Sequence, residues 1–254
     1  MKLIFRTLSL LLCCVLLLAS CSKLTTLKFE DEQYKDTKNN VTYLQAPLCY
    51  EAVKLVDGGV ARVKRSVGED LVLYAVDGAD RKEMLANEQY ELFYAEGVTL
   101  PKLWEMNVSE VYICQTKLIS AQIASVNKAE DVAALIALYQ SGAAFPKAKV
   151  SMEQSTGHYY LKFVSKDYPA IYYCLEYLEF EEEVLVYERI KDTSSFTPKY
   201  TGVEVTYEDH EYVENGETYV EHLAVYHFGT GILYDRAAGV CYPSNGIFDA
   251  YMDR

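Results

Sequence analysis

Glu214-Asn215-Gly216-Glu217 carries the strongest structural signal in this chain. The dipeptide Asn-Gly at its centre favours a type I′ turn, because that turn needs positive φ at both central residues. Residues 203–228 around the turn are rich in β-branched and aromatic side chains, which suit strands. The stretch therefore predicts a β-hairpin over residues 203–228 with a two-residue loop.

A two-residue loop fixes which side chains of the two strands face each other. Each of two histidines would lie opposite a carboxylate, and an aromatic pair near the turn would stabilise the register. The base of the hairpin would be more apolar than its charged tip, so we expect the tip to project into solvent. The expected pairs are Asp209 with His222, His210 with Glu221, Tyr212 with Tyr219, Val205 with Tyr226, and Thr206 with Val225.

The histidines and carboxylates of this hairpin also suggest a metal site or a response to pH. A carboxylate beside an imidazole favours the protonated form, and both groups are ligands for divalent metals. The candidate ligands are His210, Glu221 and Glu208 on one face, with Asp209 and His222 on the other. An open two-stranded ribbon encloses a metal poorly. The sequence therefore favours an ordinary charged hairpin, and we predict no cofactor.

The clearest helix of the chain is expected over residues 128–140. Asn127 fits the N-cap and Glu130 the third helical position of a capping box. Gly142 follows this segment. Glycine readily adopts left-handed geometry and therefore commonly ends a helix. An apolar stripe, which we interpret as a packing face, consists of Val132, Leu135, Ile136 and Tyr139.

The remaining pattern is one of short apolar runs separated by turn residues, which is typical of strands. Asp57-Gly58-Gly59 predicts a further hairpin turn. We therefore expect an α+β fold, predominantly an antiparallel β meander with one clear amphipathic helix and short helices. The other strands are expected over residues 41–44, 50–56, 60–63, 71–76, 90–94, 108–116, 118–126, 148–152, 158–164, 170–180, 184–190, 232–234 and 240–242, and the short helices over 80–87, 101–106 and 245–254.

The N-terminal residues have the organisation of an export signal. Lys2 and Arg6 precede an uncharged run over residues 8–18, which is shorter than the roughly 20 apolar residues of a spanning helix. The run ends in Leu18-Ala19-Ser20-Cys21, and this stretch resembles the lipobox of bacterial lipoprotein precursors. The resemblance implies a signal peptide over residues 1–20 and a diacylglycerol on the thiol of Cys21. The protein would then be exported and anchored by lipid to the outside of the cytoplasmic membrane or to the outer membrane.

The domain organisation is expected to follow from this anchor. Residues 21–40 are mostly polar and predict a tether that begins at the lipidated Cys21. Residues 41–254 would form a single β-rich globular domain, with a possible subdivision near residue 145. The 24 basic and 37 acidic residues give a net charge of −13. Such acidity repels the phosphate backbone and anionic lipid headgroups, so neither nucleic acid nor these headgroups are expected as direct partners, and the lipid alone would provide the anchor.

Four cysteines remain beyond the leader. An even number in an exported protein suggests disulfides, whereas their position in apolar runs is equally typical of buried free thiols. The sequence leaves both alternatives open, and no C-x-x-C pair indicates a compact zinc or redox site. These residues are Cys49, Cys114, Cys174 and Cys241.

No stretch of the sequence matches a catalytic motif such as G-x-S-x-G or H-E-x-x-H. We therefore predict a membrane-anchored lipoprotein of the bacterial cell envelope with a non-catalytic binding or structural role. Its ligand would be a protein, a peptide or a glycan. The alternative is an extracytoplasmic hydrolase or a metal-binding protein that uses histidine and carboxylate groups.

Overall fold

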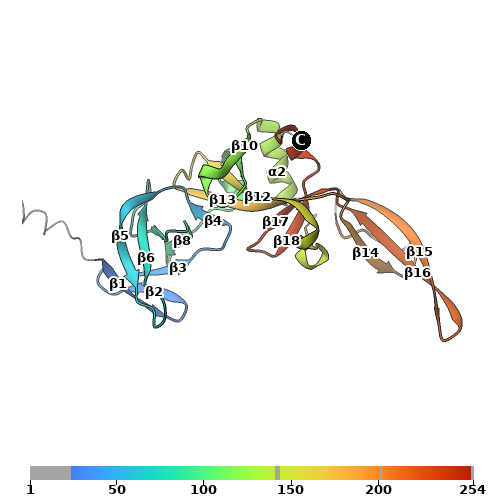
Figure 1. Cartoon of the computed structure of the whole chain (residues 1–254), viewed down its shortest axis with the longest axis horizontal. Helices are drawn as coiled ribbons and strands as arrows, with labels where there is room; N and C mark the ends of the chain where they lie inside the picture. The colour runs from blue at the N-terminus through green and yellow to red at the C-terminus, as the bar shows by residue number, and fades with distance from the viewer. Residues whose placement is uncertain (1–23, 141–143, 201, 253–254) are drawn as a thin grey trace, which may run out of the picture. The chain divides into compact units, whose positions relative to one another are not determined.

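The computed structural model describes residues 24–140, 144–200 and 202–252 (Figure 1). The chain forms two compact units, and the boundary between them falls between Val98 and Thr99. The first unit holds the described residues up to Ala46 together with Ala52–Val98, and the second holds Pro47–Glu51 and the described residues from Thr99 onward. This division differs from the single domain expected over residues 41–254 and from a subdivision near residue 145.

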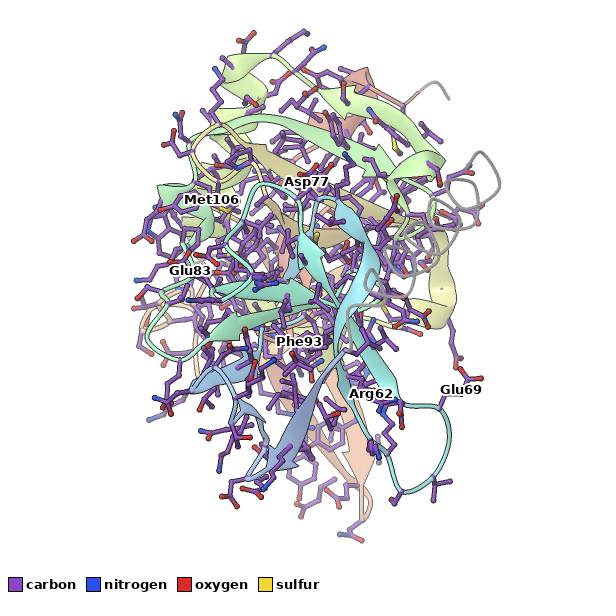
Figure 2. The ribbon with its side chains drawn as sticks, turned by 90° about the vertical axis from the view of Figure 1, so that its left-hand side faces the viewer. Arg62, Glu69, Asp77, Glu83, Phe93 and Met106 are labelled. Carbon is purple, nitrogen blue, oxygen red and sulfur yellow. The ribbon has the colours of Figure 1, made fainter. Side chains whose placement is uncertain are left out.

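The first unit is a closed barrel of seven strands in the order β1-β2-β3-β8-β7-β6-β5. Neighbouring strands are antiparallel except β1 and β5, which are parallel and close the ring. Its interior is apolar, and Figure 2 shows Phe93 inside the ring of strands. The strands are β1 (Thr25–Glu30), β2 (Gln33–Asp36), β3 (Val41–Gln45), β5 (Leu55–Val63), β6 (Leu71–Val76), β7 (Met84–Ala86) and β8 (Leu92–Ala95).

Two local expectations for this unit are wrong. The expected tether contains β1 and β2, because Leu27 packs into the barrel core while its charged neighbours stay outside. Asp57-Gly58-Gly59 lies inside the continuous strand β5, where the register with β6 shifts. Gly58 has φ of 85°, so its positive φ serves a bulge within the strand instead of a hairpin turn.

The expected helix over residues 80–87 is also replaced by other structure. Asp80 does cap a turn, since its side chain accepts the backbone N–H of Lys82 at 2.9 Å. The chain then enters strand β7 at Met84, and Leu85 becomes part of the barrel core. Burial of an apolar residue in the barrel thus overrides a local capping signal.

The second unit contains an eight-stranded sheet in the order β10-β9-β12-β13-β17-β18-β11, with β4 paired to β13. The helix α2 (Ala129–Gln140) confirms the expectation for residues 128–140, and it buries Val132 and Leu135. The Tyr139 hydroxyl on α2 lies 2.6 Å from that of Tyr173 on β13. The strands are β4 (Tyr50–Ala52), β9 (Val108–Cys114), β10 (Gln122–Val126), β11 (Phe145–Pro146), β12 (Ser155–Ser165), β13 (Ile171–Phe180), β17 (Gly231–Asp235) and β18 (Val240–Pro243).

A separate three-stranded sheet in the second unit contains the expected hairpin. Its order is β14-β16-β15, with β14 (Leu185–Ile190), β15 (Glu204–Glu214) and β16 (Glu217–His227). All five expected pairs are present in the register of β15 and β16. Asn215 and Gly216 have φ of 55° and 83°, as a type I′ turn requires. The hairpin prediction is confirmed.

The short helices are single 3-10 turns, and the overall class is as expected. They are η1 (Leu103–Glu105), η2 (Ile119–Ala121), η3 (Lys147–Lys149), η4 (Met152–Gln154) and η5 (Ile247–Ala250). The fold is β-rich and mostly antiparallel with one α-helix among the described residues, which confirms the predicted fold class. Within the described part of the chain, no helix is both long and apolar enough to cross a membrane.

Candidate functional site

The distal half of the hairpin β15–β16 is a two-stranded ribbon that is open to solvent. The third strand, β14, pairs only with His222–His227 of β16, and Figure 1 shows the hairpin extending past it. Tyr212 and Tyr219 face each other across the strands with ring centroids 5.6 Å apart and planes inclined by 20°. They are 39% and 40% exposed, so this stacked pair is held on the surface and not in a core.

Further side chains extend this exposed surface around the tip. The His210 ring stacks near Tyr212, with centroids 6.5 Å apart, on the same face of the ribbon. On the opposite face Val213 and Val220 are 72% and 50% exposed. The ribbon therefore presents aromatic groups on one face and aliphatic groups on the other.

The hairpin is also strongly anionic. Between residues 204 and 227 the chain contains seven carboxylates and neither lysine nor arginine. Arg189 on β14 forms an ion pair with one of them. Since most of these groups are exposed, the ribbon combines a negative potential with accessible tyrosines. The carboxylates are Glu204, Glu208, Asp209, Glu211, Glu214, Glu217 and Glu221.

Three of the candidate metal ligands of the hairpin form ion pairs: Asp209 and His222 with each other, and Glu221 with Arg189. Asp209 accepts a hydrogen bond from His222 Nδ1 at 2.6 Å, as the register predicted. Glu221 lies opposite His210 in the register but pairs with Arg189. In the part of the chain that the structure describes, no group of three or more histidine, cysteine, aspartate or glutamate side chains is arranged to hold a metal ion.

The base of the three-stranded sheet is anchored in a hydrophobic core. Val186, Tyr226 and Phe228 pack with Phe145 and Leu178, which belong to the eight-stranded sheet. Phe145 and Phe228 lie with ring centroids 3.9 Å apart. The exposed tip is thus carried by a strand pair whose other end is fixed in the body of the second unit.

Sequence reasoning missed a second polar cluster, on one face of the eight-stranded sheet. His158 Nε2 lies 2.8 Å from Glu176 Oε2, and Arg236 Nη1 lies 3.8 Å from the other oxygen of that carboxylate. The Tyr160 ring stacks on His158 with centroids 5.0 Å apart. The period of two along β12, which puts His158, Tyr160 and Lys162 on one face, was the available signal.

A buried ion pair continues this polar face. Lys162 is 3% exposed and donates to the Glu51 carboxylate, which is 8% exposed as a residue. The ammonium also lies 5.3 Å from the ring centroid of Tyr172. Burial lowers the pKa of Lys162, but the neighbouring acidic groups Cys174 and Glu51 raise it more, so the net change is upward. The pair is consistent with a structural role, because a lysine that stays charged is a poor base.

The four cysteines that the structure describes are free thiols: Cys49, Cys114, Cys174 and Cys241. Burial is the main cause that raises the pKa of Cys49 to about 11 and that of Cys241 to about 12. Burial raises the pKa of Cys114 and Cys174 as well. A nucleophilic cysteine needs a lowered pKa, so these thiols have the properties of packing groups.

The lipidation site predicted at Cys21 lies outside the described residues, as do the signal peptide predicted over residues 1–20 and Gly142. Comparison of the chain with protein-family models, with curated proteins and with solved structures finds no match.

Proposed function

We propose that this chain is an exported lipoprotein, anchored through Cys21, that binds a partner without catalysing a reaction. The observation that carries the binding role is the exposed, stacked pair Tyr212–Tyr219 on the anionic ribbon. Tyrosine is enriched at protein interfaces, because its ring supplies large contact area while its hydroxyl stays polar. The three-stranded sheet is the proposed binding surface.

The charge of the ribbon indicates the kind of partner. Seven carboxylates without a lysine or arginine create a field that attracts cationic groups and repels anionic ones. Strand β15 is also an edge strand, so an extended segment could pair with its backbone. A second copy of the hairpin would meet like charges at that edge. These features favour a protein or peptide partner with basic side chains over an acidic glycan.

A photo-reactive phenylalanine analogue at Val213 tests this surface in intact cells. Val213 is 72% exposed at the tip, and Thr37 in the barrel supplies an exposed control position. We expect a discrete protein adduct from position 213 that disappears in the variant Tyr212→Ser/Tyr219→Ser. Tyr168→Ser, which removes an exposed tyrosine from the turn between β12 and β13, should leave the adduct unchanged.

The same experiment can reject the proposal. An adduct that persists in the double variant, or that forms equally from position 37, would show that the tyrosine pair is not the contact surface. An adduct that is destroyed by glycan-cleaving enzymes would replace the protein partner by a glycan.

The anchor is tested separately by the variant Cys21→Ser. Without the thiol no lipid can be attached, so the protein should move from the membrane fraction to the soluble fraction or accumulate with its leader intact. Cys49→Ser serves as the control, since Cys49 is a buried thiol of the folded unit. Unchanged membrane association of Cys21→Ser would contradict the anchor.

A further inference from the structure

The barrel carries a groove on its surface. It has a volume of about 810 Å³ and lies between β1, Tyr34 of β2 and the loop that joins β5 to β6. Apolar and basic side chains dominate its lining. The residues on which the argument depends are Lys28, Phe29, Tyr34, Lys64, Arg65 and Val67.

Two apolar side chains on this groove are directed to solvent. Phe29 is 55% exposed and Val67 is 86% exposed. The Phe29 ring packs on Tyr34 with centroids 4.9 Å apart, and Tyr34 in turn meets Phe93 edge-on at 5.0 Å. Because Phe93 lies in the barrel core, Phe29 is supported from beneath and held outward. A rigid, outward-facing phenylalanine beside an exposed valine is a suitable group for insertion into a lipid surface.

The cations of the groove are available to an external anion. Lys28, Lys64 and Arg65 are all exposed, and the structure assigns them no ion pair with a described carboxylate. The one carboxylate in the lining, Glu30, is 3.3 Å from the ammonium of Lys35. The groove is therefore locally cationic in a chain whose net charge is −13.

The loop itself also contains two carboxylates, which lie outside the groove lining. Asp70 is 3.9 Å from Arg62, and Figure 2 labels Arg62 on the strand and Glu69 on the loop that follows it. Glu69 remains as a negative charge near the three cations of the groove. The groove thus offers three cations, against two paired carboxylates, Glu30 and Asp70, and one flanking carboxylate, Glu69.

The covalent chain limits how far this groove can be from the proposed anchor. Thr26 is part of the groove lining and follows Cys21 by five residues. Five residues of fully extended chain span at most about 18 Å. A lipid on Cys21 would therefore hold the groove within a short distance of the bilayer surface.

We propose that this groove is a membrane-contact surface, in which Lys28, Lys64 and Arg65 meet anionic phospholipid headgroups and Phe29 and Val67 enter the interface. The inference rests on the proposed anchor for its biological setting. It assigns the barrel a definite face toward the bilayer. The lipid on Cys21 would supply the affinity for the membrane, and the groove would set the orientation of the barrel on its surface.

Vesicle binding of an unlipidated chain tests the contact without the anchor. The polypeptide 22–254 retains every residue that the structure describes, and it is mixed with vesicles of phosphatidylcholine alone or with 40% phosphatidylglycerol. We expect binding to the anionic vesicles only, decreasing as salt is raised. Lys64→Glu/Arg65→Glu should weaken this binding by at least about tenfold, since each basic group near an anionic surface contributes about fivefold.

Arg81→Glu/Lys82→Glu is the matched control, because it reverses the same two charges elsewhere on the barrel. It should bind anionic vesicles within about twofold of the unchanged chain. Phe29→Ser/Val67→Ser should reduce the binding that survives at high salt, which reports the apolar part of the contact. Circular dichroism of each variant should match that of the parent chain.

Absence of binding to anionic vesicles, or equal weakening by the two charge reversals, would overturn the membrane-contact surface. A failure of lipidation would appear instead in the fractionation of Cys21→Ser and leaves this vesicle assay unaffected. The two proposals can therefore fail independently.

Discussion

The hairpins β12–β13 and β15–β16 are built from similar material but occupy opposite environments. All four strands have 10 or 11 residues, and both hairpins are rich in tyrosine. β12–β13 is flanked by β9 and β17 and is largely buried, whereas the distal half of β15–β16 pairs with no further strand among the described residues. The difference lies in the other residues. The first hairpin combines its tyrosines with leucine and phenylalanine, whereas the second combines them mainly with carboxylates.

An exposed strand pair needs support from the rest of the fold. A two-stranded hairpin is marginally stable in water by itself. The β15–β16 ribbon is supported at its base by Tyr226 and Phe228 and at its tip by the Asn215-Gly216 turn and the stacked tyrosines. Its carboxylates oppose pairing with a second copy. It can therefore remain exposed and available to a partner of opposite charge.

The largest expected effect comes from truncating the core of the first hairpin. Phe163 on β12 is completely buried, and Phe163→Ala should lower the free energy of unfolding by about 3–5 kcal/mol. Tyr212→Ala in the second hairpin should cost no more than about 1 kcal/mol, which is the value of an exposed aromatic pair. Urea unfolding of both variants measures the contrast. Equal losses would show that the distal ribbon is part of the cooperative core.

The second largest loss of stability is expected at the buried ion pair between Lys162 on β12 and Glu51 on β4. Lys162→Met leaves the Glu51 carboxylate buried without its ammonium, so we expect a loss of about 3 kcal/mol. The double variant Lys162→Met/Glu51→Gln removes the buried charge altogether and should recover most of this loss. The exposed pair Lys54–Asp77 is a control, and Lys54→Met should change the free energy of unfolding by less than about 1 kcal/mol. If the double variant is no better than the single one, the pair is not coupled.

A smaller and local effect is expected at the turn of the second hairpin. Gly216 has φ of 83° and open space around the position of a Cβ, so Gly216→Ala introduces backbone strain of about 1–2 kcal/mol. We expect faster hydrogen exchange at backbone amides of the distal ribbon and an unchanged melting temperature of the body. Thr218→Ala, at an exposed neighbouring position, should leave exchange nearly unchanged. A global decrease in protection would contradict local opening.

The thiols give the smallest change in stability and the sharpest contrast in reactivity. With the pKa of Cys49 at about 11 and that of Cys241 at about 12, both are protonated at pH 8 and should react with a thiol reagent only after unfolding. Val213→Cys should react at once in the native protein. These folded pKa values are raised above the ordinary value of 9.0, so the stability from burying the neutral thiols is fully present below pH 9. It is lost as the pH rises through 11 to 12.

Native labelling of four cysteines at the rate of Val213→Cys would contradict this burial. Mass spectrometry of the labelled protein before and after denaturation counts the accessible thiols directly.

Local signals predicted a large part of this fold. The Asn215-Gly216 turn gave the register of β15 and β16, and the capped apolar stripe gave helix α2, because both signals lie within a few neighbouring residues. The barrel could not be predicted in this way. Its closure pairs Thr25 with Ala61, and the polar outward side chains of β1 and β2 resemble those of a tether.

The same difference between local and long-range contacts applies to the candidate site. The hairpin pairs Asp209–His222 and Tyr212–Tyr219 could be predicted because they follow from one turn. The Lys162–Glu51 pair joins residues 111 positions apart, and no local pattern indicates it. Likewise, nothing in the sequence near Phe29 shows that the loop after β5, a strand distant in sequence that pairs with β1, would complete a groove around it.

The central claim is that the chain reaches its partner from a lipid anchor at Cys21, and the N-terminal peptide of the membrane-extracted protein tests it most directly. Mass spectrometry should find Cys21 as the first residue, carrying the mass of a diacylglycerol, with no peptide from residues 2–20 in the mature protein. A mature protein that retains these residues, or that begins at an unmodified Cys21, would contradict the account.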